Sequence, residues 1–221
     1  MLNSPKQKPE LVFNAEKHEY RVNGIVWPNV TGLIQEFGLV DFSNVPQDRL
    51  EYKKVLGSAV DVACNYLDHG ILDKASLDER LIPYVQAYEK FCLVTGFEID
   101  SERSQVPLVS RKWRFCGTND MFGNLEGERV IVDPKCTWVL YEPAGTQLAG
   151  YEMLWNENYP KEKVHRRYAL QLKPNGNYDL KEYSDKTDFT DFQACLHLHW
   201  QKRNKYKTAK GESHDYDNSN S

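Results

Sequence analysis

The residues best suited to do chemistry lie in Val130-Ile-Val-Asp133-Pro-Lys135, where a carboxylate and an ammonium group are two positions apart. If this stretch is a β-strand, successive side chains point to opposite faces, so Asp133 and Lys135 share one face. Proline cannot donate to a strand ladder, so Pro134 indicates a sheet edge or a local break, and its carbonyl stays free to bind a metal ion. A solvated surface ion pair is the alternative interpretation of Asp133 and Lys135.

A second carboxylate, Asp120, precedes a turn-like segment that runs from Gly123 to Gly127. With the turn near Leu125, a hairpin sets Asp120 roughly opposite Ile131 and makes it a diagonal neighbour of Asp133, at about 7 Å between Cα atoms. Two carboxylates at that separation suit Mg²⁺ or Mn²⁺, which would polarise a phosphodiester oxygen and activate water. A slip of one residue in the register would turn Asp120 to the wrong face.

Two further groups of residues have types that suit contact with DNA. Gln147 and Tyr151 are four positions apart and share one face of an expected helix, where an amide and a phenol could bind phosphate oxygens. An ordinary amphipathic face explains the same spacing. The cluster of Arg111, Lys112 and Arg114 fits contact with a phosphate backbone, and it fits a solvated basic face equally well.

The sequence predicts a mainly helical first half that precedes these strands. After a loose opening dozen residues, a hairpin over 18–27 turns at Asn23-Gly24. Helices follow over about 30–38, with Thr31 as a possible N-cap, and over about 46–67 and 81–95. The 97–109 stretch looks extended.

The second half supplies the sheet and two more helices. Strands are expected over 113–122 and 129–137, a helix over 146–157 and a hairpin over 168–183. Asp188 would cap a last helix that reaches about Tyr206. We therefore predict a single domain over 1–210 with a disordered tail over 211–221, because that tail is rich in Ser, Asn and Asp.

Composition limits the classes of protein to which the chain can belong. Its 221 residues are 40% hydrophobic and 27% charged, which is typical of a soluble globular protein. A net charge of −4 argues against a general polyanion binder. There is no apolar run long enough for a membrane span and no signal-peptide pattern, so we expect a cytoplasmic protein without membrane contact. The five cysteines lack metal or disulfide spacing.

In sequence order, Gly117-Thr-Asn-Asp120, Ile131-Val-Asp-Pro-Lys135 and Gln147-Leu-Ala-Gly-Tyr151 resemble the RecB-like and phage-exonuclease branch of the PD-(D/E)XK nucleases. The resemblance extends to the N-terminal and late hairpins and covers about residues 18–205. It implies an α/β (α+β) fold, with a mixed central β-sheet flanked by helices around a restriction-endonuclease-like core. It also implies that Asp120 and Asp133 bind metal, that Lys135 is catalytic, and that Gln147 and Tyr151 position the substrate.

The resemblance also implies lesser roles and one departure. Glu102 matches an acidic position before the core hairpin and would be a supporting metal ligand. Gly57-Ser-Ala-Val60-Asp61 carries Asp61 where members of the branch commonly have a metal-binding histidine. An aspartate can still bind a hard cation, but a solvent-facing helix residue explains Asp61 equally well. The cysteine spacing does not match the iron-sulfur cluster of some relatives, so none is expected.

The function implied is a phage-encoded, Mg²⁺- or Mn²⁺-dependent DNA exonuclease acting in recombination or in processing of DNA ends, in the cytoplasm of the host cell. A phage recombination protein or a single-strand-binding protein is a possible partner, and the oligomeric state stays open. Two alternatives remain: a structure-selective endonuclease, and a catalytically weak DNA-binding module of the same fold, which Asp61 and the negative net charge favour.

Overall fold

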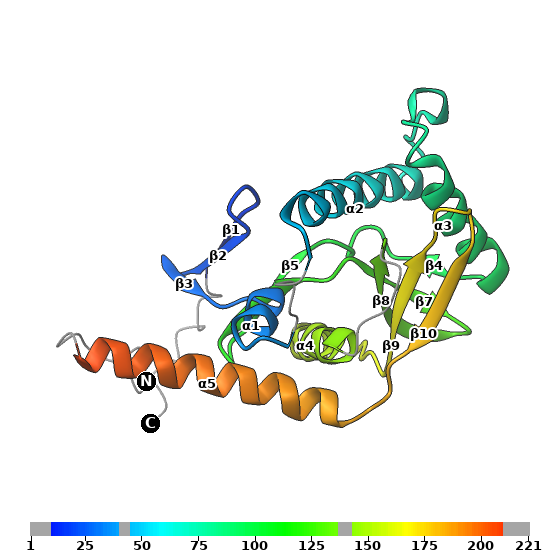
Figure 1. Ribbon diagram of the computed structural model, residues 1–221. Helices are drawn as coiled ribbons and strands as arrows, with labels where there is room; N and C mark the ends of the chain where they lie inside the picture. Colours follow the sequence, from blue (N-terminus) through cyan, green and yellow to red (C-terminus); the bar gives the residue numbers. More distant parts are fainter. Residues whose placement is uncertain (1–9, 40–44, 137–142, 210–221) are drawn as a thin grey trace.

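The computed structural model describes residues 10–39, 45–136 and 143–209. Its centre is a mixed five-stranded sheet in the order β10-β9-β8-β7-β4, in which β8 and β9 are parallel and the other pairs are antiparallel (Figure 1). The strands are β4 (Glu98–Ile99), β7 (Met121–Leu125), β8 (Glu128–Lys135), β9 (Arg166–Leu172) and β10 (Tyr178–Glu182). The predicted mixed sheet with flanking helices is confirmed.

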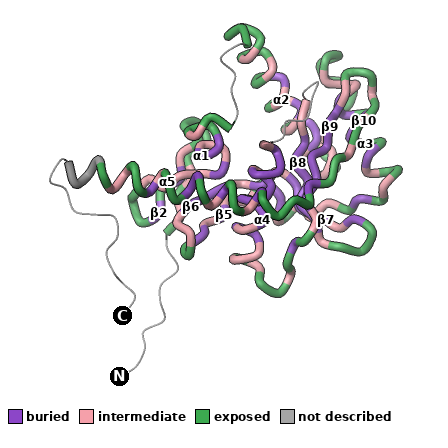
Figure 2. Tube along the Cα trace, turned by 60° about the horizontal axis from the view of Figure 1, so that its bottom comes forward, coloured by how far each residue is buried: buried purple, intermediate pink, exposed green. Residues whose placement is uncertain are grey.

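Helices cover both faces of this sheet (Figure 1). One layer consists of α2 (Gln47–Asp68) and α3 (Ile82–Thr95), with the short 3-10 helix η1 (Lys74–Ser76) between them in sequence. The other layer consists of α1 (Val30–Glu36), α4 (Pro143–Asn158) and α5 (Thr187–Ala209). Alternation along β8 separates the two cores, since Val130 and Val132 pack against α2 and α3 whereas Ile131 packs against α4. Figure 2 shows the buried chain concentrated in these strands and in α4.

The β7–β8 hairpin is confirmed, but its turn and register differ from the expectation. The turn residues are Glu126 (φ 56°) and Gly127 (φ 81°), both left-handed, as a two-residue type I′ turn requires. Phe122 therefore pairs with Ile131, where Asp120 was expected. The predicted register is therefore wrong by two residues. Because side chains along a strand return to the same face every two residues, each side chain still lies on its predicted face.

A small sheet of β1 (Leu11–Asn14), β2 (Glu19–Val22) and β3 (Ile25–Trp27) precedes the helices. The hairpin at Asn23-Gly24 is confirmed, with both residues at positive φ. Strand β1 corrects the expectation of a loose opening dozen residues. Its alternate residues Leu11 and Phe13 pack against Tyr20 and Val22, which gives this short segment an apolar face to bury.

Three helix boundaries also differ. Asn29, and not Thr31, caps α1, because its extended backbone lets its side chain accept a hydrogen bond from Gly32 N at 2.7 Å. Asp188 lies inside the first turn of α5 and does not cap it; its carboxylate pairs with Arg167. Helix α4 starts at Pro143, three residues before the predicted position.

No helix within the described ranges is both long and apolar enough to cross a membrane. The expected strand end at Thr137 and the expected tail over 211–221 lie outside these ranges.

Candidate active site

The predicted catalytic residues gather at the end of β8, where β7 begins. Strand β8 pairs with β9 as far as Lys135↔Gln171 but with β7 only as far as Val132↔Met121. Pro134 therefore lies where β8 has a partner on one side only, which agrees with the local edge that a proline indicates. Asp133 and Lys135 point to the α4 face, as their alternation with the buried Val132 requires.

Asp120 lies between two strands and not inside one. The expected strand over 113–122 is interrupted, because β6 (Phe115–Thr118) pairs with β5 (Pro107–Ser110) while β7 joins the central sheet. Between them, the Asn119 carbonyl accepts a hydrogen bond from Gln105 N at 2.9 Å. Continuing the β7–β8 register places Asp120 directly opposite Asp133, so the two carboxyl groups meet and lie close enough to share a proton.

Asp133 is the most deeply buried charge of the site. Only 1% of it is exposed, and within the described residues its carboxylate oxygens have no hydrogen-bond partner apart from Lys135 and Asp120. Its neighbours are the Asp120 carboxyl group and the Lys135 ammonium, whose Nζ lies 2.6 Å from Oδ2. Burial, and then the adjacent Asp133 charge, hold the pKa of Asp120 well above its usual range. Two buried carboxyl groups with so few donors need a proton or a metal cation between them.

Lys135 lies at the rim of this pair, with 28% of its side chain exposed. Besides Asp133, its Nζ donates to Gln147 Oε1 at 3.1 Å. Burial alone would lower the pKa of Lys135, but the Asp133 and Asp120 carboxylates outweigh it and raise this pKa above its ordinary value. Lys135 therefore stays an ammonium group at neutral pH.

Two hydroxyl groups fix the orientation of the Gln147 amide. Its Nε2 donates to Thr31 Oγ1 at 3.1 Å and to the Tyr151 hydroxyl at 3.4 Å. Since an amide donates at one end and accepts at the other, these bonds turn the carbonyl end toward Lys135. Sequence reasoning assigned Gln147 and Tyr151 to the site but took Thr31 for a helix cap.

Sequence reasoning also missed Tyr20 and Thr118. The Tyr20 hydroxyl, from the small N-terminal sheet, lies 2.7 Å from Thr118 Oγ1. Burial, with a smaller contribution from the Asp120 charge, raises the pKa of Tyr20 to about 12. Thr118 precedes Asp120 by two positions, a spacing that could have indicated a shared face.

Asp61 approaches the site from α2, in the opposite helix layer. It lines a small pocket together with Asn65, Gln105, Asp120 and Pro134. Burial and the charge of Asp133 raise the pKa of Asp61 to about 6, against the lowering effect of Lys135.

The donor set fits a hard cation bound by two residues. No group of three or more His, Cys, Asp or Glu residues forms a metal cluster in the described part of the chain. Asp120 and Asp133 nevertheless form an oxygen-rich pair beside Pro134, and Lys135 is the one cation in contact with Asp133 among the described residues. Oxygen donors of this kind suit Mg²⁺ or Mn²⁺ better than zinc.

Glu102 and the basic cluster of Arg111, Lys112 and Arg114 do not lie beside Asp120 and Asp133. Glu102 is exposed in the turn after β4 and is not among the residues that line the pocket. The basic cluster occupies the β5–β6 turn, where Glu157 near the end of α4 accepts hydrogen bonds from Arg111 N and Lys112 N. Glu157 lies ten residues after Gln147, which is about 15 Å along the helix. Arg114 stacks on Trp200 at 4.3 Å from the ring centroid.

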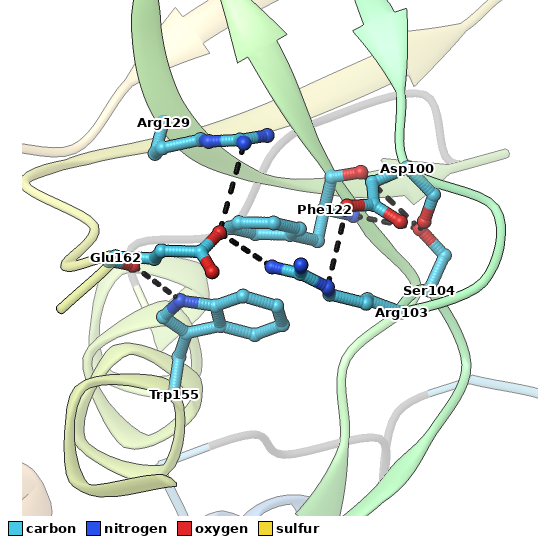
Figure 3. A network of polar contacts seen from close by, with 7 residues as sticks. All are labelled: Asp100, Arg103, Ser104, Phe122, Arg129, Trp155 and Glu162. Carbon is cyan, nitrogen blue, oxygen red and sulfur yellow. Dashed lines mark hydrogen bonds and ion pairs between the residues drawn. The ribbon is translucent and has the colours of Figure 1, made fainter. Parts of the chain in front are cut away.

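A polar network holds the β4–β5 turn, which carries Gln105, against the sheet (Figure 3). Ser104 Oγ donates to Asp100 O at 2.9 Å and accepts from Phe122 N at 3.0 Å. Arg103 pairs with Glu162 at 2.5 Å, and Phe122 stacks on Trp155 (Figure 3). The network holds this turn in place. Gln105, in the turn, donates its backbone hydrogen bond to Asn119, the residue before Asp120.

Comparisons with known proteins give only remote similarities. No protein-family model and no curated protein matches the sequence. A solved structure of a presumed exonuclease from Eubacterium rectale has a TM-score of 0.45 and 13% identity, over 73% of this chain and 68% of that chain. The alkaline exonuclease of Laribacter hongkongensis has a TM-score of 0.36 and 12% identity, over 82% and 93%. These values are too low to transfer an activity to this chain.

Proposed function

We propose that this protein is a divalent-metal-dependent deoxyribonuclease of the PD-(D/E)XK type that hydrolyses phosphodiester bonds at DNA ends. The observation that carries the proposal is the buried Asp133 carboxylate, which adjoins the Asp120 carboxyl group and has the Lys135 ammonium 2.6 Å from its Oδ2. Holding two carboxyl groups together away from water has a cost in stability, so a function is the better explanation.

Each residue has a role that follows from its position. Asp120 and Asp133 would hold the cation, with the Pro134 carbonyl as a further donor and Asp61 as an accessory carboxylate. A bound Mg²⁺ or Mn²⁺ supplies Lewis-acid stabilisation of the phosphate and a lowered pKa of the attacking water. Lys135 donates to the developing negative charge while Asp133 and Gln147 hold its ammonium group. Tyr151 and Gln147 orient the phosphate backbone.

The primary experiment compares cleavage of linear duplex DNA in Mg²⁺ with cleavage in EDTA, for the wild type and for Lys135→Ala. We expect cleavage in Mg²⁺ only, and a loss of at least about 100-fold in the variant, because Lys135 stabilises charge in the transition state. Lys173→Ala is the matched control, since its exposed ion pair with Asp179 lies on the β9–β10 hairpin. Wild-type protein without metal-dependent cleavage of any DNA would overturn the proposal.

Attack at DNA ends is a separate part of the proposal and has its own test. An exonuclease degrades linear DNA and leaves covalently closed circles intact. Equal rates on both substrates would assign the same chemistry to a structure-selective endonuclease.

A DNA-binding module without catalysis is the second candidate function. It is favoured by the contact of Lys135 with Asp133, which neutralises one carboxylate, and because no three His, Cys, Asp or Glu residues in the described part of the chain are placed to hold a metal together. Binding of DNA without cleavage, at equal affinity in Mg²⁺ and in EDTA, would support it.

The wider setting is proposed from the sequence resemblance alone. The nuclease would be a single domain over residues 1–210, phage-encoded, and would act in the host cytoplasm with a phage recombination protein or a single-strand-binding protein as partner.

A further inference from the structure

Helix α2 carries an apolar stripe on its outer surface. The stripe consists of Tyr52, Val55, Ala59, Val62 and Tyr66, at successive spacings of 3, 4, 3 and 4 residues. The four large members are 49%, 64%, 51% and 47% exposed in chain order, although the same helix buries Leu56, Val60 and Cys64 against the sheet. Spacing of this kind is the seam of a two-helix contact. The stripe therefore has the pattern of a helix-packing face without a partner among the described residues.

The order of side chains in the stripe is the same in both directions: Tyr, Val, Ala, Val, Tyr. If two copies of α2 lie antiparallel with Ala59 at the centre, Tyr52 of one copy faces Tyr66 of the other, and Val55 faces Val62. The smallest residue lies at the crossing point, where the helices must approach most closely. A surface that complements itself about a central point is what a two-fold symmetric dimer requires.

Exposed polar groups on one flank of the stripe can pair in the antiparallel arrangement. Glu51 and His69 are exposed near the two ends of that flank. Antiparallel pairing brings Glu51 toward His69 of the second copy, where a carboxylate and an imidazole can form a hydrogen bond.

We propose that this stripe is a dimerisation surface, through which a second copy of this chain packs antiparallel on α2. Half-exposed tyrosine and valine side chains leave on the order of 100 Å² each, so the stripe exposes about 400 Å² per copy. With its flanks, the interface would bury on the order of 1,000 Å² in total, near the lower limit of specific interfaces. We therefore expect a weak dimer that dissociates on dilution.

The dimer leaves the candidate active site open. Asp61 follows Ala59 by two positions and so lies about 160° around the helix from it. The proposal is independent of the proposed nuclease function, because it concerns a different face of α2.

Sedimentation velocity across the micromolar range tests the association. The wild type is expected to shift from monomer to dimer with rising concentration, and Ala59→Arg to stay monomeric at every concentration. Arginine has nearly the helix propensity of alanine, so α2 should stay folded, which circular dichroism checks. Leu93→Arg is the matched control, since Leu93 is 85% exposed on α3. A wild type that stays monomeric, an Ala59→Arg variant that still dimerises, or a Leu93→Arg variant that does not would each overturn the proposal.

Oxidative cross-linking tests the geometry. Residue 59 lies at the two-fold axis, so Ala59→Cys should form a disulfide-linked dimer. In the antiparallel pair, residue 52 lies about 10 Å along the helix axis from the centre. Residue 52 of one copy is therefore about 20 Å from residue 52 of the other copy, so two Tyr52→Cys chains should not form a disulfide with each other. The wild type, with five native cysteines, measures the background. Cross-linking of Tyr52→Cys to the same extent as Ala59→Cys, or of neither, would contradict the antiparallel dimer.

Discussion

Two charged clusters lie on the same face of the central sheet, and both contact α4, but their charges are arranged in opposite ways. In the first, which we call the Arg167 cluster, a buried arginine lies between Glu152 (3.2 Å) and Asp188 (3.3 Å). In the candidate site, two carboxyl groups lie at the centre and the Lys135 ammonium lies at the rim.

The Arg167 cluster has its cation at the centre. Arg167 is 2% exposed and also donates to the carbonyls of Gly145 and Asp185. Burial still raises the pKa of Glu152 to about 7, against the lowering effect of Arg167. Packing is tight where α4 meets α5, because a Cβ added to Gly145 would meet Asp188 at 2.4 Å. The cluster joins β9, α4 and α5, and its outer side, with Asp185 and Asp188, lines a cavity of about 430 Å³.

The candidate site has no cation at its centre among the described residues. A central guanidinium satisfies the carboxylates around it, whereas an ammonium group at the rim leaves the space between Asp120 and Asp133 for another cation. The two clusters therefore differ in the position of the cation and not in the burial of carboxylates as such, and the proposed metal site depends on that difference.

The largest effect on stability is expected from Arg167→Met. It keeps the length of the side chain but removes the cation between two buried carboxylates, so the free energy of unfolding should fall by about 3–5 kcal/mol. Urea unfolding in EDTA measures it. Arg80→Met, at an exposed ion pair with Asp78, should leave the midpoint unchanged. A loss below about 1 kcal/mol for Arg167→Met would mean that this cluster is not structural.

The next largest effect is expected on the rate of cleavage, when the Lys135 ammonium group at the rim of the site loses its fixed position. Thr31→Val removes one acceptor that orients the Gln147 amide, so Lys135 should lose its fixed position. We expect kcat for DNA cleavage to fall about tenfold while KM stays nearly constant. Thr31→Ser, which retains the hydroxyl, should restore kcat; equal losses in both variants would refute this positioning role.

The smallest effect is a gain in stability from Asp120→Asn. The folded-state pKa of Asp120 is raised, so its contribution to stability is present below the unfolded pKa near 3.9 and is lost as the pH rises through the folded value. An amide never ionises, so the metal-free variant should be more stable than the wild type by on the order of 1 kcal/mol at pH 8. The gain should shrink toward pH 4. Destabilisation at pH 8 would show that the two carboxyl groups do not repel one another.

Much of the site could be predicted because it depends on local alternation. The faces of Asp133 and Lys135 follow from strand geometry alone, and the local edge at Pro134 follows from the missing amide hydrogen. Asp120 lies beside Asp133 as predicted although the predicted register is wrong by two residues, because a shift of two residues leaves each side chain on the same face of the sheet.

The rest depends on contacts between residues far apart in the chain. Tyr20 and Thr118 are 98 positions apart, and Thr31 and Gln147 are 116 apart. No local pattern indicates such pairs. The Arg167 cluster was missed for the same reason, and so was the interruption before Asp120, which a hydrogen bond from Gln105 maintains. The catalytic and metal-binding roles of these residues remain predictions.

The central claim is that Asp133 and Asp120 hold a divalent cation, and isothermal titration of Mn²⁺ into the metal-free protein tests it most directly. The wild type should bind Mn²⁺ at pH 7.5, and Asp133→Asn should lose that binding while its thermal unfolding in EDTA stays cooperative. Equal Mn²⁺ binding by both proteins, or none by the wild type, would contradict the account.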